Sequence, residues 1–318
     1  MKYLAVRLYA IGLTFCSLMA QAGEAASPQD KNARPAPVAP LEEIVVSANR
    51  MVDHRTLERV VVPFVESHVT PSPRFGQISR WYEPICPQTI GLKPLYNEFI
   101  SRRVVEVARR VRAPTRRAGS CTPNIEILFS FHPQEQLDYI ASKNRTQLGY
   151  SEHPKDDVRF SRAIQVWYVT GTQAFVMQHV YGCDSGGHCL FTTAGITVDN
   201  AYTPVTGDLG FLADGTRSEF VHATVIADAN ALIQYPLQAV GDYIAMLVLT
   251  RTALNGCNPL PSVIDLLSAD CGARQKTSGL TEADTAYLKA LYSSNLELKV
   301  NFERGEMRSR MVKSIETR

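Results

Sequence analysis

The sequence predicts an α+β fold, in which a mixed N-terminal sheet with one long helix precedes a buried central helix and a helical C-terminal half. Three observations predict this fold. β-branched runs alternate with helical segments up to about residue 227, residues 243–249 are apolar on every side, and helical periodicity dominates afterwards. The chain has 318 residues, 45% hydrophobic and 20% charged. This composition is that of a globular protein rather than a disordered or fibrous one.

The first 22 residues have the pattern of a secretory signal peptide. Lys2 and Arg7 precede an apolar stretch at 8–19, and Ala20 and Ala22 are the small residues that a cleavage site requires. We therefore expect a periplasmic or secreted protein. No later apolar run is long enough to span a bilayer, so no transmembrane domain is expected after removal of the signal.

Behind the signal, residues 23–41 are rich in Ala and Pro, which predicts a flexible leader before a single α+β domain at 42–318. The 33 basic and 31 acidic residues give the full chain a formal charge of +2, and loss of Lys2 and Arg7 brings this close to zero. A balanced charge argues against a nucleic-acid partner.

In the N-terminal half, strands are predicted at 43–47, 60–65 and 77–82, where strand-forming residues gather. Residues 93–112 form an amphipathic helix that Pro114 ends. Its apolar stripe consists of Ile100, Val104, Val107 and Val111, and its opposite, solvated face carries Arg102, Arg103, Glu106, Arg109 and Arg110.

Further strands are predicted at 124–131, 163–170, 190–198 and 219–227, with a short helix at 133–143. Pro236 suits the first turn of a helix that runs to about residue 254 and is buried all round. Helices at 260–268, 281–293 and 303–316 follow. Thr281 and Asp284 have the spacing of a capping box for the second of these.

Six cysteines remain after the signal, the even count expected of three disulfides in an oxidising compartment. Short loop closure favours the pairs Cys86–Cys121, Cys183–Cys189 and Cys257–Cys271 among the 15 pairings that six cysteines allow. A structural zinc ion is the alternative for one pair, because His179, Cys183, His188 and Cys189 have suitable side chains. Their spacing is poor for zinc, so we expect a disulfide there and no metal site.

The arginines from Arg102 to Arg117 admit two interpretations, a surface for an anionic partner or a solvated helix face followed by a polar loop. The solvated helix face followed by a polar loop is the simpler interpretation.

No complete catalytic motif is present: the sequence lacks H-E-x-x-H, G-x-S-x-G, a phosphate-binding loop and G-x-G-x-x-G. No cofactor is expected. The candidates for a dispersed catalytic site are His222 and Asp228, which would share one face of a strand, and Asp242 at the start of the buried helix. Glu219 and His222 form E-x-x-H, but residues three apart on a regular strand face opposite ways. Each candidate also has a structural explanation, such as the helix macrodipole for Asp242.

Residues 41–50 (LEEIVVSANR) resemble the TonB-box region of outer-membrane receptors. This resemblance implies a strand that pairs with a TonB-like partner, although an ordinary edge strand explains the same residues.

The chain from about Val60 onward resembles exported proteins of Gram-negative bacteria with a zincin-like, that is metallopeptidase-like, layout. The resemblance is carried by Arg80-Trp81, Ile85-Cys86-Pro87, Cys121-Thr-Pro-Asn124, residues 222–229 and Gly279-Leu-Thr-Glu-Ala-Asp284. It implies a mixed sheet, a buried active-site helix and a helical half. In zincins that helix carries zinc ligands, whereas this chain has Gly241-Asp242-Tyr243-Ile244-Ala245 there, so no ligand is carried over.

These observations predict an exported, disulfide-bonded, non-catalytic protein that binds or scaffolds another envelope protein. A hydrolase with a dispersed site is the first alternative, and a TonB-linked uptake accessory is the second.

Overall fold

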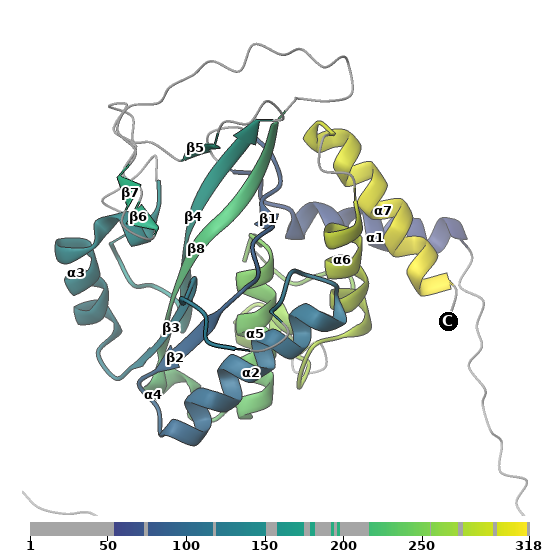
Figure 1. Ribbon diagram of the computed structural model, residues 1–318. Coiled ribbons are helices and arrows are strands. Elements are labelled where there is room, and N and C mark those ends of the chain that lie inside the picture. The colour runs from purple at the N-terminus through teal and green to yellow at the C-terminus, as the bar shows by residue number, and fades with distance from the viewer. Residues whose placement is uncertain are drawn as a thin grey trace, which may run out of the picture. The chain divides into compact units, whose positions relative to one another are not determined.

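The computed structural model describes residues 54–316 except 73–75, 117–118, 151–157, 175–178, 182–191, 194–195, 198–215, 255, 273–275 and 295–297. These residues form an α+β fold, as the sequence predicts (Figure 1). The signal, the leader and the TonB-box-like segment lie outside the described residues.

One mixed sheet has the strand order β2-β3-β8-β4-β5. The strands β2 (Pro87–Ile90), β3 (Ile125–Ser130) and β8 (Thr216–Asp228) are parallel, while β4 (Ile164–Ala174) is antiparallel to β8 and β5 (His179–Tyr181) to β4. β1 (Arg80–Trp81) also pairs with β8, in parallel. A separate ribbon joins β6 (Thr192–Thr193) to β7 (Ile196–Thr197).

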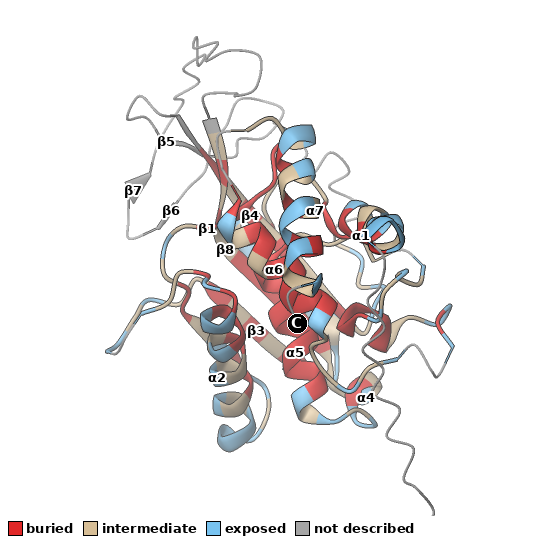
Figure 2. Ribbon diagram, turned by 90° about the vertical axis from the view of Figure 1, so that its right-hand side faces the viewer, coloured by how far each residue is buried: buried red, intermediate tan, exposed pale blue. Residues whose placement is uncertain are grey.

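The helices are α1 (His54–His68), α2 (Pro94–Arg110), α3 (Pro133–Lys143), α4 (Ala229–Leu232), α5 (Leu237–Leu249), α6 (Glu282–Ser293) and α7 (Val300–Glu316). Two 3₁₀ turns, η1 (Arg145–Leu148) and η2 (Val263–Leu267), complete the described elements. α2 connects the parallel strands β2 and β3, which cannot be joined by a short turn. α5 is buried from Ala239 to Leu249, as its apolar sequence predicts (Figure 2).

The two faces of the sheet support cores of very different size. The main core lies between the sheet and α1, α2, α5, α6 and α7, with Trp81, Phe220 and Ile244 among its fully buried side chains. On the other face α3 and η1 cover a small second core of Leu137, Ile140, Leu148, Trp167 and Ile226. Figure 1 shows α3 on the opposite side of the long strands from α5.

A β-bulge interrupts the pairing of β4 with β8. Val169 pairs with His222 and Thr170 with Phe220, so Val221 is the extra residue. The bulge shifts the alternation of side chains by one position. Glu219 and His222 consequently lie on the same face of the sheet, and the expectation that they face opposite ways is wrong.

The predicted strand at 60–65 is also wrong, because these residues belong to α1. Leu57, Val61, Phe64 and Val65 are buried at helical spacing against the main core, and this packing outweighs the strand preference of the β-branched run. Pro63 lies inside the helix. Residues 260–268 form a 3₁₀ turn at Val263–Leu267 instead of an α-helix, and β2 is an additional strand.

A buried ion pair attaches β1 to the C-terminal helices. Arg80 donates to a carboxylate oxygen of Glu303 on α7 and to the carbonyl of Leu291 near the end of α6. Both side chains are almost inaccessible, at 4% and 3% exposure. Burial raises the pKa of Glu303 to about 7, and the Arg80 charge opposes that shift.

Candidate ligand-binding cavity

The structure does not bring His222 and Asp228 together. Both lie on β8, six positions apart, which corresponds to about 20 Å along a strand. The Asp228 carboxylate accepts the backbone N–H groups of Asn230 at 2.9 Å and Ala231 at 3.3 Å. Asp228 is therefore the N-cap of α4, and its carboxylate has a structural role.

His222 has a different acidic neighbour. Glu126 on β3 lies close enough to raise the pKa of His222, but burial is the larger effect and lowers it overall. The Nε2 atom of His222 is buried and has no hydrogen-bond partner among the described residues. This imidazole is neutral near pH 7. Unlike Asp228 and Asp242, whose carboxylates accept hydrogen bonds, His222 has a side-chain atom without a partner among the described residues.

Asp242 is part of a bidentate ion pair. Its carboxylate accepts the Nε of Arg103 at 2.5 Å and the Nη2 at 3.1 Å, and it also accepts the backbone N–H of Leu280 at 2.9 Å. Hydrogen bonding to Asp242 raises the pKa of Arg103. The interaction joins α2, α5 and the segment before α6. Arg103 is thus not on a solvated face as the periodicity indicated, since its side chain is only 15% exposed.

Two glycines make this interaction sterically feasible. A Cβ atom on Gly241 would lie 3.1 Å from Cγ of Arg103, and one on Gly279 would lie 2.8 Å from Oδ2 of Asp242. Small residues at both points let the helices and the Gly279 segment approach the ion pair closely.

Two of the predicted disulfides are present. Cys86 pairs with Cys121 and Cys257 with Cys271. Cys183, His188 and Cys189, three of the four residues of the alternative zinc site, lie outside the described residues. No group of three or more metal-ligating side chains occurs within the described ranges.

Two neighbouring cavities lie beside β4 and the C-terminal end of α5. Their volumes are about 320 and 360 Å³, and Ser161, Arg162 and Leu254 line both. The smaller one is also lined by Tyr243, Ile264, Leu267 and Asp270, and the larger one by Tyr150, Gln165, Trp167, Tyr168, Arg251 and Thr252. Cavities of this size hold small organic molecules in many proteins.

In the smaller cavity Tyr243 lies near Arg162. Burial raises the pKa of Tyr243 to about 12, and the nearby Arg162 charge opposes this shift. The Tyr243 hydroxyl therefore remains protonated at neutral pH. Within the described part of the chain this hydroxyl has no hydrogen-bond partner, so it can donate to a ligand.

The larger cavity has a positive wall. Arg162 and Arg251 line it, whereas none of its lining residues carries a carboxylate. The Thr252 hydroxyl is buried and has no partner among the residues described. Trp167 and Tyr168 add aromatic surface.

The Cys257–Cys271 disulfide holds one wall of the smaller cavity. Gly256 and Asp270, which line the cavity, are the chain neighbours of Cys257 and Cys271. Between them Asp265 accepts both the backbone and the side-chain N–H of Asn258, at 3.2 and 2.7 Å. The wall is therefore fixed by a covalent link and by hydrogen bonds.

Sequence reasoning did not find this site. It identified Tyr243 only as part of a buried helix, and Arg162 and Arg251 are single arginines beside a strand and a helix end. No spacing pattern connects them, since the topology alone brings residues near 162, 243 and 251 together.

Comparisons with protein-family models, with curated proteins and with solved structures find no match to this chain. Among the described helices, none has the length and apolar character needed to cross a membrane.

Proposed function

We propose that the chain is an exported, non-catalytic binding protein of the cell envelope whose cavities hold a small organic anion with an aromatic or apolar body. The observation that carries this proposal is the larger cavity, which is lined by two arginines and two aromatic side chains and, among its lining residues, by no carboxylate. Guanidinium groups recognise carboxylate and sulfonate-like oxygens through charge-assisted hydrogen bonds.

The roles of the candidate acids support binding rather than catalysis. Asp228 caps α4, and Asp242 is paired with Arg103. The signal-like N-terminus and the two disulfides support export, because disulfides persist mainly in oxidising compartments.

The hydrolase alternative keeps one supporting observation, the buried Nε2 atom of His222 beside Glu126. A neutral imidazole with a free ring nitrogen has the form of a general base. The TonB-linked alternative depends on residues 41–50, and its test is a pull-down with a TonB C-terminal domain with and without that segment.

Isothermal titration with 2-naphthalenesulfonate, and with the uncharged 2-naphthalenemethanol as reference, tests the proposed function. We expect saturable binding of the sulfonate only. Arg162→Gln removes a charge-assisted hydrogen bond worth about 1.5–3 kcal/mol, so it should weaken binding by roughly 10–100-fold. Arg159→Gln is the matched control, because Arg159 is exposed, three residues away, and lines neither cavity.

Equal binding of both naphthalenes, or an equal effect of the two substitutions, would contradict the proposal. Turnover of a naphthyl ester that disappears in His222→Asn would instead favour the hydrolase.

A further inference from the structure

Four exposed arginines gather where α2 ends, and we call Arg109, Arg110, Arg112 and Arg116 the arginine turn. No carboxylate within the described ranges forms an ion pair with any of them. Two arginines on α7 differ in this respect, since Arg308 pairs with Glu66 and Arg310 with Glu306. The arginine turn is therefore a local excess of positive charge on a chain whose overall charge is nearly balanced.

Arg112 adopts a backbone conformation that favours glycine. It has φ 66°, in the left-handed region, and directly follows Val111, the residue that caps the end of α2. The N–H of Ala113 donates to the carbonyl of Ala108 at 2.9 Å and that of Arg112 to Arg109 at 3.2 Å, which is a Schellman motif. Glycine is the residue of lowest strain here, so arginine costs stability and adds an exposed cation.

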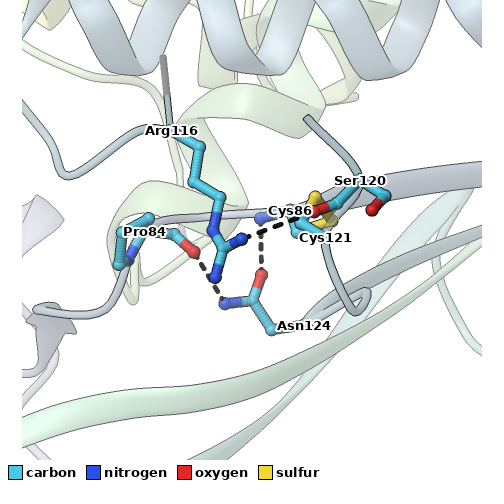
Figure 3. Close-up of a disulfide and its surroundings, with 6 residues drawn as sticks. All are labelled: Pro84, Cys86, Arg116, Ser120, Cys121 and Asn124. Carbon is cyan, nitrogen blue, oxygen red and sulfur yellow. Dashed lines mark hydrogen bonds between the residues drawn. A yellow bond between two sulfur atoms is a disulfide. The ribbon is translucent and has the colours of Figure 1, made fainter. Parts of the chain in front are cut away.

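The Cys86–Cys121 disulfide anchors the segment that follows. Arg116 donates to the carbonyl of Ser120 at 3.4 Å, next to Cys121 (Figure 3). Asn124 accepts the N–H of Cys86 at 2.7 Å and donates to the carbonyl of Pro84 at 3.2 Å, so the base of this loop is fixed on both sides (Figure 3). Arg116 thus lies on a segment that the disulfide anchors at Cys121, while Arg109, Arg110 and Arg112 lie at the end of α2.

The helix end does not account for the whole cluster. Two cations, Arg109 and Arg110, suffice to complement the negative end of the α2 dipole, and Arg112 and Arg116 lie beyond it. Arg109 and Arg116 each donate one hydrogen bond to a backbone carbonyl, whereas a guanidinium has five N–H groups. The remaining donors are on exposed side chains.

We infer that the arginine turn is a docking surface for an anionic phospholipid bilayer. Guanidinium groups match phosphate oxygens in geometry and charge. Four exposed guanidiniums spread over a helix end and a loop suit the many phosphates of a membrane plane, whereas one small anion needs an enclosing site. Each arginine near such a surface contributes a factor of about five to membrane partitioning.

Co-sedimentation of the full mature chain with vesicles tests this inference. We expect binding at low salt to phosphatidylcholine vesicles that contain a third phosphatidylglycerol, and weak binding to phosphatidylcholine alone. Arg112→Gly should weaken partitioning about five-fold while raising the urea midpoint of unfolding, because glycine relieves the left-handed strain. The triple variant Arg109→Gln, Arg110→Gln, Arg116→Gln should lose on the order of a hundred-fold.

Arg102→Gln is the control on the same helix. The Nη1 of Arg102 lies 3.7 Å from Oε1 of Glu98 and its Nε lies 3.7 Å from Oε1 of Glu106, so these two carboxylates balance its charge. It should bind like the wild type. The inference is overturned if Arg112→Gly and the triple variant bind normally, or if Arg102→Gln loses as much. Displacement by soluble glycerol phosphate would indicate a free phosphate ligand, and tighter binding of poly-glutamate an acidic protein, and either result also overturns it.

Discussion

Replacement of Asp242 by alanine tests whether this residue holds the fold together or serves chemistry. The Asp242 side chain is 1% exposed and accepts three hydrogen bonds, two from Arg103 and one from Leu280. Its removal leaves a largely buried guanidinium and a backbone N–H without their partner. Breaking a buried ion pair typically costs about 3–5 kcal/mol.

We expect a value at the lower end of that range. The Arg103 side chain is 15% exposed and also donates to Glu106 at 3.2 Å, so it can partly compensate. A loss of about 3 kcal/mol corresponds to a fall in Tm of roughly 6–12 °C for a domain of this size.

The assay is urea unfolding followed by circular dichroism, with both described disulfides kept oxidised. Arg103→Met and the double variant complete a double-mutant cycle, and we expect the double variant to be more stable than Asp242→Ala alone, because no charge is then left without its partner. Unchanged or increased stability of Asp242→Ala would refute the structural role, since residues retained for function are often unfavourable for stability.

Three further predictions concern other contacts. Burial lowers the pKa of His68 to about 4, so on acidification the unfolded chain binds a proton before the folded one. The free energy of unfolding, relative to that of His68→Gln, should be constant above pH 6.5 and fall on the order of 3 kcal/mol as the pH drops to 4. A difference between the two proteins that does not change with pH in urea unfolding would contradict this. Gly279→Ala forces a Cβ atom to 2.8 Å from Asp242 and should cost about 1–3 kcal/mol in the same urea assay, and a neutral result would show that the segment moves freely. The double substitution Cys257→Ser, Cys271→Ser opens a loop with a separation of 14 residues and should cost roughly 3 kcal/mol and weaken 2-naphthalenesulfonate binding, whereas undiminished affinity by titration would show that the cavity wall does not need the disulfide.

Local signals predicted the elements whose sequence and environment agree. α3 has the predicted bounds, the apolar run of α5 is buried as expected, and Thr281 and Asp284 form the predicted capping box. Each of these depends on residues close together in the sequence. α1 failed because two local signals competed: a β-branched run and a helical stripe occupy the same residues, and only packing on the main core decides between them.

The candidate site was less accessible to sequence reasoning. The two described disulfides follow from parity and loop length. The partner of Asp242, in contrast, is Arg103, which is 139 residues away and which the helical pattern assigns to a polar face. The bulge at Val221 likewise depends on the register in which β4 pairs with β8, and the sequence of β8 alone does not predict it.

The unequal cores on the two faces of the sheet have a consequence for motion. The α3 layer is held by a few apolar side chains, so it should open more often than α5 and exchange its amide hydrogens first. Leu148 and Trp167 belong both to that thin layer and to the wall of the larger cavity. A bound occupant would therefore slow amide exchange in α3, and this thinly packed layer would report whether the cavity is filled.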